Sequence, residues 1–74
     1  MNSRLENVFK TTFGIDAVPA DLSQTNCEAW DSVNHLNLVL ALEAEFGVTF
    51  EPEEIAAMQN VRIVAELLSG KSST

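Results

Sequence analysis

The sequence predicts an all-α protein, a four-helix bundle with a long first loop and a short third helix. Apolar residues recur at intervals of three and four along most of the chain, which is the spacing of one helix face. Each of these segments is bounded by residues that cap or end helices. No apolar alternation with a period of two is long enough for a sheet. Together these observations favour helices packed around one core.

Size and charge limit the possible classes of function. The 74 residues make one domain, with a core expected over residues 4–69 and a frayed tail over residues 70–74. A formal charge of −7 argues against nucleic acid as a ligand and favours basic protein surfaces as partners. A single cysteine excludes an internal disulfide, and nothing resembles a signal peptide or a membrane span. We therefore expect a cytoplasmic monomer that does not bind membranes.

The first helix is predicted between Ser3 and Gly14. Ser3 begins a segment with the form of a capping box, and Gly14 is a natural C-terminal stop. The inward face comprises Leu5, Val8, Phe9 and Phe13. Residues 15–30 then lose helical periodicity and are rich in turn-forming residues. They predict an ordered loop, anchored to the core by Ile15, Val18, Leu22 and Trp30.

The central helix, predicted over residues 32–46, is the element around which the domain is built. Asp31 is its expected N-cap, which places Ser32 at the helix entrance, and Gly47 ends it. The core face comprises Leu38, Val39, Leu42 and Phe46. A second apolar strip on the roughly opposite side comprises Val33, Leu36 and Leu40. Because an outer helix needs only one buried face, this strip is either further core or a docking surface.

Two more helices complete the expected bundle. Pro52 at a first helical position, followed by acidic residues, predicts a short third helix that presents Ile55 and Met58 inward. At about two turns it is marginal alone, so we expect it to move most. Asn60 is the expected N-cap of the last helix, which we predict to end at Gly70. The apolar stripe of that helix comprises Val61, Val64, Leu67 and Leu68.

The start and end of the central helix carry a resemblance to a known family. Asp31-Ser32-Val33, followed by Leu38-Val39-Leu40-Ala41-Leu42-Glu43-Ala44-Glu45-Phe46-Gly47, resembles the acyl carrier proteins, and the likeness extends over residues 5–68. The motif of that family is Asp-Ser-Leu, and Val33 keeps its third position apolar. The resemblance implies a carrier and not an enzyme, with no catalytic residues. Ser32 is then the attachment point of 4′-phosphopantetheine from coenzyme A, and Asp31 caps the helix and helps a transferase hold its metal ion.

The resemblance also implies partners and cargo. The partners are a phosphopantetheinyl transferase, an acyl- or aminoacyl-loading ligase or transferase, and downstream synthase or tailoring enzymes. They dock along the central helix, and the expected docking residues are Val33, Leu36, Leu40, Glu43 and Glu54; Leu36 alternatively lines an inner cavity for the acyl chain. Fatty-acid carriers tend to have acids where this chain has Asn34 and Asn37. That difference favours a stand-alone carrier of a specialised pathway, although fatty-acid and polyketide synthesis stay open.

The same residues allow other interpretations. Without the resemblance, Ser32 is an ordinary first-turn residue of a helical interaction module whose acidic face binds a basic partner. Ser32 and His35 lie three apart on the expected helix, so their side chains can touch, as in a hydrolase. No residue is evident, however, to orient the imidazole or form an oxyanion hole. The chain has one cysteine, Cys27, and one histidine, so no metal site is expected. The acidic residues from Glu43 to Glu54 lack the spacing of a calcium loop.

Overall fold

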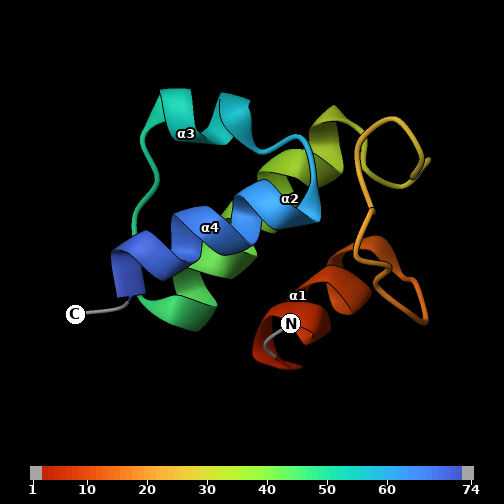
Figure 1. Cartoon of the computed structure of the whole chain (residues 1–74), viewed down its shortest axis with the longest axis horizontal. Helices are drawn as coiled ribbons and strands as arrows, with labels where there is room; N and C mark the ends of the chain where they lie inside the picture. Colours follow the sequence, from red (N-terminus) through yellow and green to blue (C-terminus); the bar gives the residue numbers. More distant parts are fainter. Residues whose placement is uncertain (1–2, 73–74) are drawn as a thin grey trace.

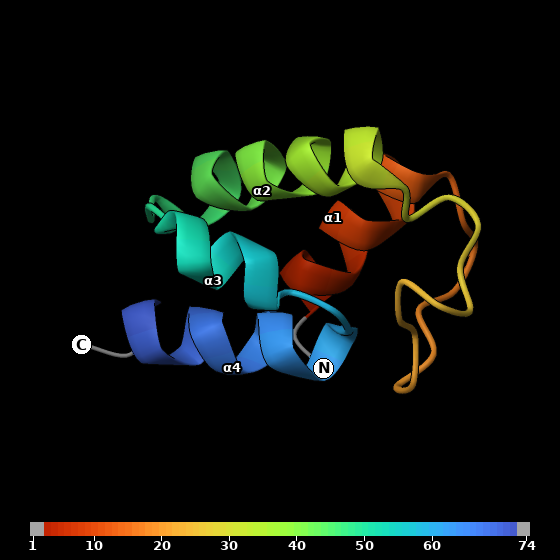
Figure 2. The same ribbon diagram turned by 90° about the horizontal axis from the view of Figure 1, so that it is seen from above.

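The computed structural model describes residues 3–72, and these contain four helices. They are α1 (Ser3–Phe13), α2 (Ser32–Phe46), α3 (Pro52–Ala57) and α4 (Val61–Ser72) (Figure 1). Seen from above, α2 and α4 lie on opposite sides with α3 and the beginning of α1 between them (Figure 2). The all-α class, the long first loop and the short third helix are therefore confirmed.

One apolar core joins the helices and the first loop. Its most deeply buried side chains are Phe9, Leu38, Leu42, Met58 and Val64. Burying a side chain of this kind stabilises the fold by roughly 1.5–3 kcal/mol. Trp30 packs edge-on against Phe9, with ring centroids 5.6 Å apart, and its ring centroid lies 5.2 Å from that of Phe13. Three expected core residues, Phe46, Ile55 and Leu67, are only partly buried against this cluster.

The loop between α1 and α2 is ordered by contacts with the rest of the protein. Leu22 and Trp30 are buried, as expected, and Ile15 and Val18 pack partly against the core. The backbone of the loop also pairs with the segment that leads into α4. The Val61 N–H donates to the Leu22 carbonyl at 3.0 Å, and the Gln24 N–H donates to the Gln59 carbonyl at 3.0 Å. The loop thus connects α1, α2 and the start of α4.

Most predicted helix ends are confirmed. Gly14 and Gly47 have φ of 65° and 64°, in the left-handed region that glycine enters without strain. The Gly47 N–H donates to the Glu43 carbonyl at 2.9 Å and closes α2. Asn60 caps α4, because its Oδ1 accepts from the Ile63 N–H at 2.8 Å. Ser3 differs from the expectation, since it lies within α1, and the residue before it is outside the described range.

The predicted end of the last helix at Gly70 was wrong. The helix α4 continues through Gly70 to Ser72, so residues 70–72 of the expected tail are helical, and residues 73–74 lie outside the described part. Gly70 does not have a positive φ. The Lys71 ammonium lies 2.9 Å from the Glu54 carboxylate and 5.3 Å from the centre of the Phe50 ring. These tertiary contacts hold the final turn and outweigh the low helix propensity of glycine.

Candidate functional site

Ser32 is the first residue of α2, and it is exposed. Asp31 is its N-cap, as predicted: the Asp31 Oδ1 accepts from the Asn34 N–H at 2.8 Å. The Asp31 carbonyl accepts the first helical hydrogen bond, from the His35 N–H at 2.8 Å. The cap fixes the direction in which the chain enters the helix. The serine is therefore presented to solvent from a rigid position.

A shallow depression of about 420 Å³ opens beside the serine. It is lined by Gln24, Trp30, Asp31, Ser32, His35 and Leu36. The indole, the imidazole and the Leu36 side chain make much of this lining apolar. Leu36 thus lines an outer depression and is 59% exposed, so the alternative that it lines an inner cavity is wrong.

His35 joins three elements at this site, in an arrangement that sequence reasoning missed. Its Nδ1 accepts from the Trp30 Nε1–H at 2.9 Å, and the Gln24 Nε2 lies 3.3 Å from the same atom. Since Nδ1 is the acceptor, the ring proton is on Nε2, which donates to the Ile55 carbonyl at 2.7 Å. The Gln24 amide also donates to the Met58 carbonyl at 3.3 Å. We call these five groups, from the first loop, α2 and the α3 region, the His35 clamp.

The clamp decides against the hydrolase alternative for these residues. A general base needs a ring nitrogen directed at the proton that it removes. In His35 one nitrogen accepts from Trp30 and the other donates to Ile55, so neither is directed at Ser32. Within residues 3–72 no group of three or more His, Cys, Asp or Glu residues is arranged to hold a metal ion. Cys27 is partly buried and forms no disulfide.

The second apolar strip of α2 lies on the surface. Val33, Leu36 and Leu40 are 67%, 59% and 64% exposed. The sequence left open whether this strip was further core or a docking surface, and the exposure excludes the core. Large apolar side chains gathered on one exposed helix face are typical of a surface that contacts other proteins. No helix in the described part of the chain is long and apolar enough to cross a membrane.

The two acidic residues expected beside this strip also support the fold. The Glu43 carboxylate accepts from the Phe50 N–H at 2.9 Å. The Glu54 carboxylate accepts from the Glu51 N–H at 2.8 Å and pairs with Lys71 at 2.9 Å. The Glu51 N–H and the neighbouring ammonium both favour the ionised form, which holds the pKa of Glu54 below its ordinary value. Both carboxylates are thus partly engaged within the protein.

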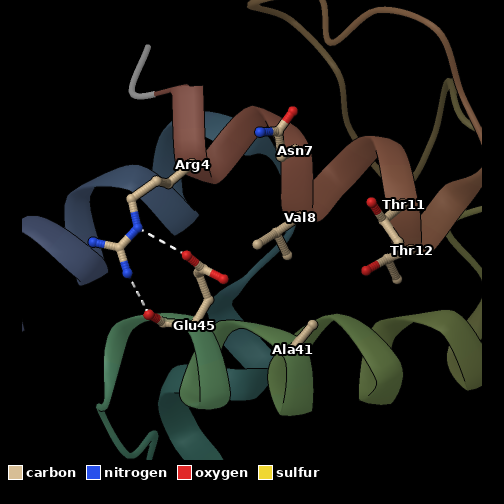
Figure 3. Close-up of a pocket in the computed structure, with 7 residues that line it drawn as sticks. All are labelled: Arg4, Asn7, Val8, Thr11, Thr12, Ala41 and Glu45. Atoms are coloured by element: carbon tan, nitrogen blue, oxygen red, sulfur yellow. Dashed lines mark hydrogen bonds and ion pairs between the residues drawn. The ribbon is translucent and has the colours of Figure 1, made fainter.

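A second hollow lies away from the serine, between α1 and α2 (Figure 3). It measures about 270 Å³ and is lined by Arg4, Asn7, Val8, Thr11, Thr12, Ala41 and Glu45. The Arg4 Nε donates to the Glu45 carboxylate at 2.8 Å, and another guanidinium nitrogen donates to the Glu45 carbonyl. Arg4 also lies 4.9 Å from the centre of the Phe46 ring. These contacts connect the N-terminal end of α1 to the C-terminal end of α2.

Known proteins resemble this chain in sequence and in fold. No protein-family model matches the sequence. The acyl carrier protein of Petrotoga mobilis is 41% identical over 56 residues, which cover 76% of this chain and 66% of that protein, slightly under two thirds of its length. The solution structure of holo acyl carrier protein from Geobacter metallireducens matches with a TM-score of 0.86 and 29% identity. That match covers 96% of this chain and 84% of the other.

A four-helix domain that presents a capped serine at the head of its central helix has the architecture of a carrier domain. With a relative at 41% identity and a closely similar solved structure, this chain belongs to the acyl carrier protein family. Both relatives are named as carriers and not as enzymes. These names agree with the prediction of a carrier protein and not an enzyme.

Proposed function

We propose that this protein is an acyl carrier in which Ser32 bears 4′-phosphopantetheine and carries acyl or aminoacyl groups as thioesters between enzymes. One observation carries the proposal: in a chain of this family, Ser32 is exposed at the first position of α2, directly after the capping Asp31. The Geobacter relative is described as a holo acyl carrier protein, which supports a prosthetic group in the family.

The residues around Ser32 fit this group. A phosphate on the Ser32 hydroxyl would lie at the N-terminus of a 15-residue helix, where the helix dipole and backbone N–H groups favour an anion. The depression beside the serine has room for the part of the arm nearest the phosphate. The Asp31 carboxylate is a neighbouring negative charge, and its bond to the Asn34 N–H offsets part of that charge.

Loading requires one new phosphoester bond. The Ser32 Oγ attacks the phosphorus next to the pantetheine part of coenzyme A, the pyrophosphate bond breaks, and the nucleotide part leaves. Ser32 supplies the nucleophile, and the transferase supplies the base and the metal ion. When bound, the group supplies a flexible thiol that forms thioesters. Tethering keeps the carried intermediate at high effective concentration for each enzyme on which the carrier docks.

The proposed partners are the phosphopantetheinyl transferase, a loading ligase or transferase, and the synthase or tailoring enzymes that follow. The exposed strip of Val33, Leu36 and Leu40 is the proposed contact surface. Glu43 and Glu54 are proposed to supply negative charge to the same partners. Asn34 and Asn37 make the first turns of α2 less acidic than in the usual fatty-acid carrier, which favours a specialised pathway. A cytoplasmic location remains a prediction.

Mass spectrometry after enzymatic loading tests the attachment. Apo protein is incubated with coenzyme A and a broad-specificity phosphopantetheinyl transferase, and intact and peptide masses are measured. We expect a gain of one phosphopantetheine on the peptide that contains Ser32. Ser32→Ala removes only the nucleophile at an exposed position, so it is expected to fold normally and to show no gain.

The alternative is an acidic helical interaction module without a prosthetic group. It is favoured if the folded apo protein gains no mass while the same transferase modifies another carrier. In that case, Ser32→Ala would also leave the function in cells unchanged. Loss of function in that variant with unchanged folding supports the carrier.

A further inference from the structure

The His35 clamp lies at the place where a group attached to Ser32 would begin. Ser32, His35 and Leu36 line the same depression, so the proximal part of the arm would lie against the clamp. On its other side, the imidazole is bonded to the Ile55 carbonyl of α3. The clamp therefore stands between the depression and the third helix.

Among the four helices, α3 contributes least to the core. No residue within Pro52–Ala57 is buried, and Ile55 is only partly so. The anchor of this region is Met58, directly after the helix, which is fully buried in the same core as Leu38 and Leu42. A segment with few buried contacts moves at lower free-energy cost than the rest of a domain. The bonds of the clamp add a second anchor to α3.

An apolar chain carried on Ser32 would gain by entering the core, because burial of apolar surface is favourable in proportion to its area. Between the depression and α3 lies the imidazole, which is fixed at both ring nitrogens. Trp30, which bonds the first of these nitrogens, is itself buried and packed against Phe9 and Phe13. The imidazole therefore cannot turn away without leaving the indole N–H unpaired.

We propose that His35 is a specificity-determining residue for the cargo. By holding α3 in place, the clamp keeps the carried group outside the core, which suits short or polar groups such as aminoacyl groups and disfavours long apolar chains. Opening the clamp admits such a chain to the core. This proposal rests on the carrier function proposed above.

The test compares two cargoes on four proteins. Wild type, His35→Ala, His35→Gln and Asn37→Ala are loaded with acetyl- and decanoyl-phosphopantetheine from the corresponding acyl-coenzyme A. The glutamine amide has an acceptor oxygen and a donor NH₂ group, which can replace the acceptor and donor nitrogens of the neutral imidazole. Asn37 is an exposed residue of the same helix outside the clamp, so its variant is the matched control. Nuclear Overhauser contacts between the decanoyl chain and the Met58 methyl group, and the melting temperatures of both forms, are then measured.

In wild type, His35→Gln and Asn37→Ala we expect no contact between the decanoyl chain and Met58, and melting temperatures of the two forms within ~2 °C. In His35→Ala we expect that contact, and a decanoyl form that melts more than ~5 °C above the acetyl form, because the buried chain stabilises the fold. Trp30→Phe, which removes the indole N–H, serves as a second opening variant if His35→Ala does not fold.

Two results overturn the proposal. One is contact between the decanoyl chain and Met58 in wild type as strong as in His35→Ala. The other is the absence of both contact and stabilisation in the folded opening variants. Failure of the carrier function itself is seen earlier and separately, as the absence of any mass gain on Ser32, and it removes this proposal as well.

Discussion

At the residue scale, Asp31 has two separable roles, since it caps α2 and brings a negative charge next to Ser32. Its Oδ1 satisfies the Asn34 N–H. We predict that Asp31→Ala lowers the free energy of unfolding by about 1 kcal/mol, the usual cost of losing an N-cap. Asp31→Asn retains a good cap, so its free energy of unfolding is expected to lie within about 0.5 kcal/mol of the wild-type value. Urea unfolding at neutral pH measures both.

The same pair of variants separates folding from recognition. If Asp31→Asn is as stable as wild type and yet loads more slowly with phosphopantetheine, the charge serves the transferase and not the helix. Equal destabilisation by asparagine and alanine would contradict the cap, because asparagine caps as well as aspartate does.

Sequence reasoning at this scale succeeded where the relevant physics is local. A capping aspartate acts on an N–H three residues later, and a glycine ends a helix through its own φ, so Asp31, Gly14, Gly47 and Asn60 were assigned correctly. The His35 clamp was missed because its partners are distant in sequence, with Ile55 lying 20 positions from His35. The sequence signal was present in Trp30 and His35, a tryptophan and a histidine five positions apart across a helix start, but only the fold brings Ile55 to them.

At the scale of elements, α3 depends on its first turn and on its tie to α4. The Glu51 N–H and Lys71 both stabilise the ionised carboxylate of Glu54, so its pKa lies below the ordinary value of 4.5. A carboxyl group with a lower pKa in the folded state stabilises the protein above its unfolded pKa. That contribution is lost as the pH falls from about this ordinary value through the lower folded value.

We therefore predict that Glu54→Gln lowers the urea midpoint at pH 7. We also predict that the free energy of unfolding falls less between pH 5 and pH 3 in this variant than in wild type. The measurement is urea unfolding at several pH values in that range and at pH 7, monitored by circular dichroism. Glu53→Gln is the matched control, because Glu53 is exposed on the same turn of α3. An identical pH dependence in wild type and Glu54→Gln would contradict the tie between α3 and α4.

The last turn of α4 shows why helix ends are harder to predict than helices. Gly70 was a reasonable local stop, and no local signal opposed it. The helix continues because Lys71 contacts Glu54 and the Phe50 ring, both of which precede α4 in the sequence. Tertiary contacts of this kind outweigh a propensity difference of about 1 kcal/mol.

At the scale of the whole molecule, the fold class could be predicted because it follows from the spacing of apolar residues over many positions. The surface could be predicted only in part. The helical spacing separated the two apolar faces of α2, but the exposure of Val33, Leu36 and Leu40 depends on where α1, α3 and α4 pack. The roles of Glu43 and Glu54 within the fold depend on the same packing.

This division of the surface leads to a prediction about docking. Leu40 is 64% exposed and lies outside both the core and the depression beside Ser32. Leu40→Ser is therefore expected to change the free energy of unfolding by less than about 0.5 kcal/mol. It is expected to lower kcat/KM of the phosphopantetheinyl transferase roughly 5- to 30-fold, the range for an apolar contact residue near the centre of an interface. Ala17→Ser, an exposed substitution in the first loop, is the matched control and should leave kcat/KM unchanged.

Ionic strength separates the apolar contact from the charge of the whole protein. With a net charge of −7, association with a basic partner should slow as salt screens the attraction. The loss caused by Leu40→Ser should persist at high salt, because burial of an apolar side chain is not screened. If raising the salt abolished the difference between Leu40→Ser and wild type, the strip would act only through the charges around it. If Leu40→Ser and Ala17→Ser loaded at the same rate at every salt concentration, the transferase would not dock on this face of α2.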